Sequence, residues 1–286
     1  MTAREWFERA KKEKFAIGAF NVGNLETLEA IVAAAKNKRS PVIIEASPGE
    51  SGFMGYNNLV DIVQNYKDEG VQIILNLDHA TEFDKVRLAF DAGFDYLHFD
   101  GGQIEFEENV KIAKQIVATA HPKGVMVEGE VDHITGSSAL HTGEKVASEQ
   151  AKGNYSDPAK AKEFVERTGV DTYASFIGNA HGLYADEKRL DLNRLKQIRE
   201  AVPDTFLSLH GGSGVNHDDI RAAIEIGINK INVNTEMRSA YREELEEQLK
   251  TSDEVAMYKL YPEIMEEVQK VVEDKIDLFG SANKVS

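Results

Sequence analysis

The chain has 286 residues, of which 42% are hydrophobic and 29% charged, so it can fill a sizeable core and most of it cannot be disordered. It has no cysteine, which excludes disulfides, cysteine-ligated metal sites and thiol nucleophiles. The 49 acidic and 33 basic residues give a net charge of -16, a field that repels nucleic acid and anionic membranes, so neither is an expected partner.

Short β-rich runs alternate with amphipathic stretches of helical period along the chain. Eight such units predict an α/β fold, a parallel sheet closed into a (β/α)8 TIM barrel. A doubly wound open sheet is the alternative, but the turn after the first strand, Asn21-Val22-Gly23-Asn24, lacks the usual GxGxxG pattern. In chain order, the expected strands are Phe15–Phe20, Pro41–Ser47, Val71–Asp78, Tyr96–Asp100, Gly124–Val131, Thr172–Gly178, Thr205–His210 and Lys230–Thr235. The helices expected after them are Leu25–Lys36, Leu59–Tyr66, Glu82–Ala92, Glu107–Ala120, Pro158–Thr168, Asp191–Ala201, Asp218–Gly227 and Glu236–Leu249.

Two segments lie outside the repeat. Asp132–Ser156 is a long loop rich in Gly, Ser, Thr and His, and loops of that length are more often functional than idle, so we expect a lid. Residues 252–286 carry apolar side chains at spacings of three and four, which predicts an amphipathic helix that packs on the barrel or forms a subunit interface. Since no linker-like stretch divides the chain, we expect one barrel domain, 1–286, with 252–286 as a C-terminal helical extension.

Catalytic residues of barrel enzymes lie at the carboxyl ends of the strands, and here those ends carry reactive side chains. His79, His181 and His210 come from three different strands, and a three-histidine set leaves a divalent metal an open position for substrate. No strand end carries a lysine for a Schiff base, because Lys230 is expected to open its strand on the opposite face. The other polar residues at these ends are Asn21, Asp78, Asp100, Glu128, Glu130, Asn179 and Asn232, and His98 lies one pleat before Asp100.

A run of small residues follows the seventh strand at His210–Gly214. It is not a nucleophile elbow, since Val215 stands where G-x-S-x-G would need a glycine. Its backbone N–H groups can instead cradle an oxyanion, and barrels often hold phosphate between the loops after strands seven and eight. The segment Asn232–Thr235 would supply the other wall, so we predict a phosphate site.

Together these residues resemble the class II, zinc-dependent fructose-bisphosphate and tagatose-bisphosphate aldolase family. The similarity runs over nearly the whole chain, from Ile17–Asn21 to Leu278–Ser281, in the order that the family shows. It rests on six motifs in register: Leu77-Asp78-His79, Phe99-Asp100-Gly101, Val127-Glu128-Gly129-Glu130, Ala180-His181-Gly182, Leu209-His210-Gly211-Gly212-Ser213-Gly214 and Lys230-Ile231-Asn232-Val233.

The resemblance implies an aldehyde-lyase of glycolysis and gluconeogenesis that reversibly cleaves fructose 1,6-bisphosphate to dihydroxyacetone phosphate and glyceraldehyde 3-phosphate. A catalytic Zn2+ would polarise the C2 carbonyl and stabilise the enediolate, and Asp78 would move the C4 hydroxyl proton. By resemblance the zinc ligands are His79, His181 and His210, and Asp100 and Glu130 match positions that hold a second or displaced metal. The implied substrate and phosphate residues are Asn21, Gly182, Gly211, Gly212, Ser213, Asn232, Val233, Asn234 and Thr235, with a monovalent cation, Na+ or K+, near the phosphate loop.

The chain departs from the family pattern in its long loop. The stretch after Glu130 lacks the acidic residue that moves a substrate proton in the family, so Glu144, Glu149 or His141 is expected to replace it.

Further departures leave the substrate open. Ala80 stands where the family usually has Gly, and Gly102 stands where it often has Ser. Asn234 stands where fructose-type members have Asp and tagatose-type members have Ala. Tagatose-bisphosphate aldolase is therefore an alternative. A barrel metal hydrolase and a catalytically weak sugar-phosphate binding barrel are alternatives from other classes.

The N-terminus has no apolar run like the core of a signal peptide, and no stretch of ~18 apolar residues occurs in the chain. We therefore expect a cytoplasmic protein whose partners are small sugar phosphates, assembled as a homodimer or homotetramer.

Overall fold

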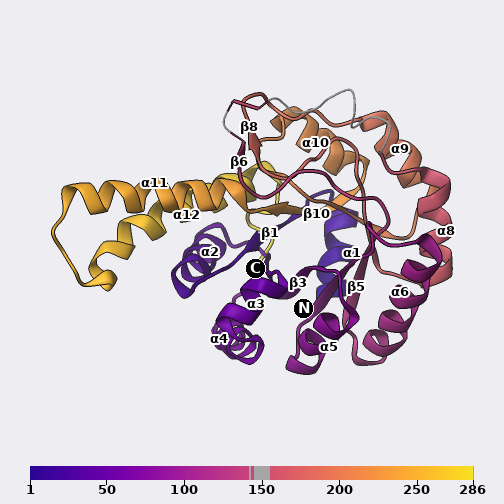
Figure 1. The fold of residues 1–286 in the computed structure, drawn as a ribbon, viewed down its shortest axis with the longest axis horizontal. Helices are drawn as coiled ribbons and strands as arrows, with labels where there is room; N and C mark the ends of the chain where they lie inside the picture. The colour runs from indigo at the N-terminus through magenta and orange to yellow at the C-terminus, as the bar shows by residue number, and fades with distance from the viewer. Residues whose placement is uncertain (142, 145–154, 286) are drawn as a thin grey trace.

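The computed structural model describes residues 1–141, 143–144 and 155–285. Its centre is a closed barrel of parallel strands in the order β1-β10-β9-β7-β5-β4-β3-β2, surrounded by helices (Figure 1). The expected (β/α)8 barrel is thus confirmed. The barrel strands are β1 (Ile17–Asn21), β2 (Val42–Ala46), β3 (Ile73–Ala80), β4 (Tyr96–Asp100), β5 (Met126–Glu130), β7 (Thr172–Ala174), β9 (Phe206–Leu209) and β10 (Ile228–Val233).

Each strand is followed by a helix whose apolar face packs on the barrel, as the periodicity predicts. Asn24 caps one of these helices by accepting the N–H of Thr27, and Asp157 caps another by accepting those of Ala159 and Lys160. These helices are α2 (Leu25–Lys38), α4 (Tyr56–Asp68), α5 (Phe83–Ala92), α6 (Phe106–Ala120), α8 (Pro158–Thr168), α9 (Leu192–Ala201), α10 (His217–Ile226) and α11 (Thr235–Thr251). A short helix, α3 (Pro48–Met54), precedes α4, and a 3-10 turn, η1 (His121–Lys123), follows α6.

All barrel strands except β4 differ from expectation at one or both ends, and two of these differences affect the site. The sixth barrel strand, β7, stops at Ala174 rather than Gly178, because the Asn179 amide bonds the Ser175 and His210 carbonyls at 3.0 Å each and so takes the chain out of the sheet. The last strand, β10, begins at Ile228, two residues earlier than expected.

Side chains that alternate along the strands fill the barrel interior in layers. The layer nearest the amino ends of the strands is apolar and belongs to one buried cluster. Helix α1 (Ala3–Glu13) packs against this layer and closes that end of the barrel. The ring of Phe7 on α1 lies 5.4 Å from the ring of Tyr96 and 5.2 Å from that of Phe206. The sequence pattern did not predict this helix. The strand residues of the layer are Ile17, Ala19, Ile43, Ile74, Tyr96, Met126 and Phe206.

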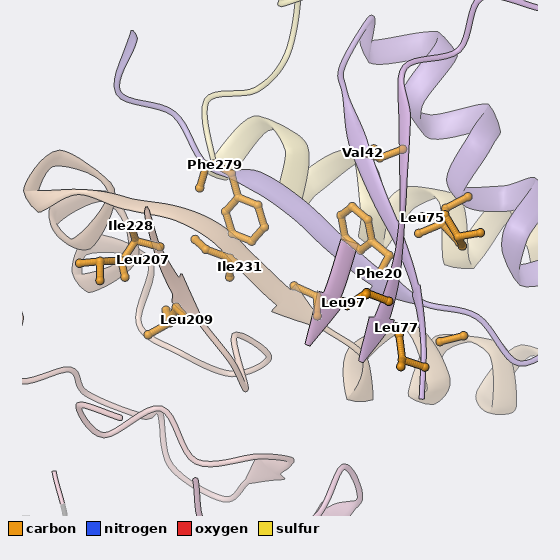
Figure 2. Packing of buried hydrophobic residues seen from close by; sticks show 14 of the residues in the cluster. Phe20, Val42, Leu75, Leu77, Leu97, Leu207, Leu209, Ile228, Ile231 and Phe279 are labelled. Atoms are coloured by element: carbon orange, nitrogen blue, oxygen red, sulfur yellow. The ribbon is translucent and has the colours of Figure 1, made fainter. Parts of the chain in front are cut away.

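The outward-facing strand side chains form the larger core between sheet and helices. Figure 2 shows Leu77 and Leu97 on the neighbouring strands β3 and β4, Phe20 on β1, and Phe279 from the end of the chain near Ile231. All five are at most 1% exposed.

The C-terminal extension is the helix α12 (Met257–Leu278), as expected from its spacing. Its buried face includes Ile264, Val268, Val272 and Ile276. It pairs with α11 to form a hairpin that projects from the barrel, and it also packs on α2 (Figure 1). No helix in the described part of the chain has the length and apolar composition needed to cross a bilayer.

Candidate active site

Most of the predicted site residues line one cavity at the carboxyl ends of the barrel strands. Asp78 and His79 come from β3, while His181 and His210 come from the loops after β7 and β9. The cavity is lined by Asn21, Asp78, His79, Ser138, His181, Gly182, His210, Gly211, Ser213, Asn232, Asn234 and Thr235. The structure therefore brings together residues that lie more than two hundred positions apart in the sequence, such as Asn21 and Thr235.

The three histidines meet at this rim. The ring centroids of His79 and His210 lie 4.5 Å apart, those of His79 and His181 5.0 Å, and those of His181 and His210 6.3 Å. His79 has a φ of 48°, a left-handed conformation, where the register between β3 and β4 shifts. This irregularity turns the His79 side chain toward the other two rings.

The ring nitrogens of His79 and His210 have the pattern of metal ligands. The Nδ1 of His79 lies 2.9 Å from Asp100 Oδ2, and the Nε2 of His210 lies 2.7 Å from Glu128 Oε1. The other nitrogen of each ring is buried and has no hydrogen-bond partner among the described residues. A histidine held by a carboxylate on one nitrogen, with the other free, is the usual arrangement of a ligating imidazole.

The charges in the cluster are unevenly distributed. Burial opposes protonation of His79, but Asp78 and Asp100 outweigh it and raise the pKa of His79 to about 9. Burial and the neighbouring His79 lower the pKa of His210 to about 3 and hold that of His181 well below its usual value. Because a metal binds neutral imidazole, His181 and His210 are already in the ligating form.

Asp78 is oriented by two amides. Asn21 Nδ2 donates to its Oδ2 at 3.1 Å, and Asn232 Nδ2 donates to its Oδ1 at 3.2 Å. Burial opposes ionisation of the carboxyl, yet the charge on His79 keeps its pKa well below the usual range. The carboxylate is therefore an ionised proton acceptor that faces the cavity.

Asp100 and Glu130 lie on the other side of His79. Together with His79 they form a second group whose ligand atoms all lie within 4.8 Å of one another. Burial raises the pKa of Glu130, whereas His79 outweighs burial at Asp100 and lowers the pKa of that carboxyl. The other such group, Asp78, His79, His98 and His210, also contains His79, so a metal could occupy either position.

His98 belongs to this cluster, a role that the sequence left open against simple packing. It is fully buried, and its Nε2 lies 3.3 Å from Glu130 Oε2. One of the two possible ligand groups consists of Asp78, His79, His98 and His210. Its position one pleat below Asp100 was the only sequence signal for this role.

Lys230 was expected to lie on the opposite face, and the structure corrects this. Because β10 starts at Ile228, Lys230 lies within the strand rather than at its start, and its side chain is fully buried inside the barrel. Its Nζ lies 2.8 Å from Glu128 Oε2 and 3.5 Å from Glu45 Oε2. Glu128 raises its pKa against the effect of burial, so the amine stays protonated and cannot act as a Schiff-base nucleophile.

Close backbone approach explains the glycines of the predicted phosphate loop. A Cβ on Gly211, at φ 59°, would lie 2.5 Å from the Ala180 carbonyl oxygen, and a Cβ on Gly182, at φ 93°, would lie 2.6 Å from that of Ser137. Ser213 and Thr235 line the same cavity, and Thr235 begins α11, whose N-terminus favours an anion.

Two other predicted binding residues do not line the cavity. The Gly212 N–H donates to the Asn232 carbonyl at 2.8 Å, which ties the seventh loop to the eighth. The Val233 side chain is fully buried in the outer core, so only its backbone can face the site.

The described part of the long loop reaches the cavity. Ser138 lines the cavity, and the two-residue strand β6 (Leu140–His141) pairs with β8 (Leu183–Tyr184), which directly follows Gly182. The His141 ring stacks on Tyr184 with centroids 4.5 Å apart, and its Nδ1 lies 3.3 Å from Glu144 Oε2. Glu149 lies outside the described residues.

Comparisons with known proteins agree with this arrangement. The family described as fructose-bisphosphate aldolase class-II matches residues 1–284. The chain is 35% identical to fructose-bisphosphate aldolase of Geobacillus stearothermophilus, over 100% of this chain and 99% of that protein. It is 34% identical to fructose-bisphosphate aldolase of Streptococcus pneumoniae, over 99% of each.

Two solved structures also resemble this chain over nearly its whole length. The YdjI aldolase from Escherichia coli K12 superposes with a TM-score of 0.85 at 33% identity, covering 99% of this chain and 98% of that one. A putative fructose-1,6-bisphosphate aldolase from Coccidioides immitis superposes with a TM-score of 0.86 at 30% identity, covering 99% and 97%.

Proposed function

The chain belongs to the class II fructose-bisphosphate aldolase family and is a lyase, and on that premise we propose that it cleaves fructose 1,6-bisphosphate reversibly to dihydroxyacetone phosphate and glyceraldehyde 3-phosphate. The observation that carries this proposal is the meeting of His79, His181 and His210 beside Asp78 in one cavity.

The residues present fit a divalent metal, on which this family depends. His79 Nε2 and His210 Nδ1 are buried nitrogens without a hydrogen-bond partner, and their rings are close to that of His181. The nitrogen donors and the open side facing the cavity favour Zn2+. The metal would supply Lewis-acid polarisation of the substrate carbonyl.

Asp78 performs the proton transfer at C4 in this proposal. It accepts the C4 hydroxyl proton as the C3–C4 bond breaks, the bonding electron pair stays on C3, and C4 leaves as the aldehyde. Condensation reverses these steps and returns the proton to the oxygen. The side-chain amides of Asn21 and Asn232 support this role because they donate hydrogen bonds to the ionised carboxylate and fix its orientation.

Binding of the C1 phosphate is assigned to the loops at Gly182, Gly211 and Ser213, with Thr235 at the N-terminus of α11. This remote binding would fix C3 and C4 against Asp78 and the metal. Asn234 also lines the cavity, and its Oδ1 is buried without a hydrogen-bond partner among the described residues. Because this acceptor is free, we expect the Asn234 side chain to bind the sugar and to distinguish one sugar from another.

After cleavage, C3 must take up a proton from a second acid–base group, which we assign to the long loop. His141 and Glu144 are the described candidates, since they contact each other beside Gly182. Glu149 is the third candidate.

The proposal extends to assembly and location. The end of the α11–α12 hairpin exposes Leu249, Val255, Met257 and Tyr258, which supports a homodimer or homotetramer formed through this arm. We place the enzyme in the cytoplasm. Light scattering on the purified protein tests the assembly.

The decisive experiment compares the two C4 epimers. Purified protein is assayed with fructose 1,6-bisphosphate and with tagatose 1,6-bisphosphate, each with and without a chelator. Preferred, chelator-sensitive cleavage of the fructose sugar supports the proposal, preferred cleavage of the tagatose sugar assigns the alternative activity, and phosphate binding without cleavage of either assigns a binding barrel.

A further inference from the structure

Lys188 is a fully buried lysine that the mechanism above does not use. Its Nζ donates to the carbonyl oxygens of Ala180 at 2.6 Å, Gly182 at 3.0 Å and Gly211 at 2.6 Å. The first two flank His181, and the third follows His210. One side chain therefore joins the two loops that carry two of the three histidines and most of the phosphate cradle.

The geometry requires that Lys188 be protonated. A carbonyl oxygen only accepts hydrogen bonds, so three of them need three N–H donors, and a neutral amine has two. Lys188 forms no ion pair with a carboxylate of the described residues, and Glu236, whose charge acts on it, pairs with Lys275 at 2.6 Å. Burial lowers the pKa of Lys188 to about 7. The buried charge is thus balanced by carbonyl dipoles and would be stabilised further by an anion next to it.

The backbone of Lys188 is fixed to the same loop. Its N–H donates to the Gly214 carbonyl at 2.9 Å, and its own carbonyl accepts the N–H of Asn216 at 3.0 Å. These bonds place the lysine stem under the segment that contains Gly211 and Ser213. The three carbonyl oxygens are therefore preorganised around a cation.

We propose that Lys188 is the built-in cation of the phosphate loop, whose ammonium occupies the carbonyl cage that a monovalent metal ion would otherwise fill and supplies the positive charge that a bound phosphate needs. A separate Na+ or K+, expected from the family resemblance, does not fit, because Nζ already lies where the carbonyl oxygens converge. Lys188 is a positioning residue, since it acts through the loops and does not line the cavity. For the identity of the sugar, but not for phosphate as a ligand, the inference rests on the proposed function.

The test measures binding of inorganic phosphate to the full-length, zinc-loaded protein by calorimetry. Tetramethylammonium is the only added cation, and the measurement is repeated with KCl or NH4Cl. The unchanged protein should bind phosphate equally well in all three buffers. Lys188→Met should bind it about tenfold or more weakly without K+, because the loops lose the buried charge that attracts the anion, and K+ or NH4+ should restore part of that loss. Lys196→Met, which removes an exposed lysine on α9, is the matched control and should behave like the unchanged protein.

Lys188→Gln keeps a hydrogen-bond donor without the charge and serves where Lys188→Met does not fold. In aldol cleavage, either variant should raise KM more than it lowers kcat, and added K+ should reverse the rise in KM. The inference is overturned if the unchanged protein needs K+ to bind phosphate, or if the folded variants bind phosphate as tightly as it does. Normal phosphate binding with no cleavage of either bisphosphate would contradict the proposed function and leave this inference standing.

Discussion

The Nδ1 of His98 accepts the backbone N–H of His79 at 3.1 Å. That N–H belongs to a residue in the left-handed conformation, so the hydrogen bond from the peptide stabilises a backbone turn that would otherwise cost about 1–2 kcal/mol. In the tautomer whose Nδ1 accepts this bond, the ring proton is on Nε2, which lies 3.3 Å from Glu130 Oε2. His98 therefore holds His79 in the direction from which it can bind a metal.

This contact predicts that His98→Ala weakens metal binding. Loss of an outer partner of a ligating histidine typically costs 10–100-fold in metal affinity, and we expect a loss in that range. A competition titration with a zinc chromophore measures it. The control is His133→Ala, which removes an exposed histidine of the long loop. Equal zinc affinity of the His98 variant and the control would show that His79 needs no such support.

Asp78→Asn should separate proton transfer from metal binding. The substitution keeps the shape but removes the proton acceptor, and a positioned acid–base group contributes ~10²–10⁴-fold, so kcat should fall by about that factor. Zinc content and KM should stay nearly unchanged, whereas His79→Ala should lose the metal as well. Steady-state kinetics and metal analysis of both variants check this. Loss of zinc from Asp78→Asn, or a kcat within about threefold of the original, would remove Asp78 from its role.

Gly211→Ala should destabilise the chain and weaken phosphate binding. The new Cβ would lie 2.5 Å from the Ala180 carbonyl oxygen, in addition to the cost of a φ of 59°. Gly124→Ala is the matched control, because Gly124 has a φ of 74° but nothing within 4 Å of a Cβ. We expect a loss of about 1 kcal/mol in the free energy of unfolding for the control and more for Gly211→Ala, measured in urea. KM should rise only for Gly211→Ala, and a rise for both variants would argue against the tight fit between the loops.

The loop assignment predicts a selective loss of proton exchange at C3 of dihydroxyacetone phosphate. We prepare Glu144→Ala, Glu149→Ala and His141→Ala and measure exchange of that proton with solvent by NMR. The variant that removes the proton-transfer group should lose both exchange and turnover. If all three retain the original exchange rate, the group lies elsewhere.

The strand-end motifs predicted the fold and most of the cavity because parallel strands of a barrel place their carboxyl ends together. His79, His181 and His210 could be brought to one rim on that argument alone. Lys188 could not, since it lies in the charged run Glu187-Lys188-Arg189, a pattern typical of exposed loops. Only the tertiary convergence of three carbonyl groups gives its ammonium a buried position.

Helix α1 and Lys230 were misjudged for related reasons. The N-terminal helix is strongly charged, and its few apolar residues, Trp6 and Phe7 among them, become significant only when they close the bottom of the barrel. Lys230 was expected at the start of its strand because the boundary was placed two residues too late, and its buried partner Glu128 is 102 residues away in the sequence.

A zinc titration of the metal-free protein, with aldol cleavage of fructose 1,6-bisphosphate followed by a coupled assay, tests the central claim most directly. The three-histidine site predicts no turnover in chelator and a linear rise in activity that ends at a fixed zinc stoichiometry per chain. Full activity in chelator, or covalent trapping of the substrate on a lysine by borohydride, would contradict it.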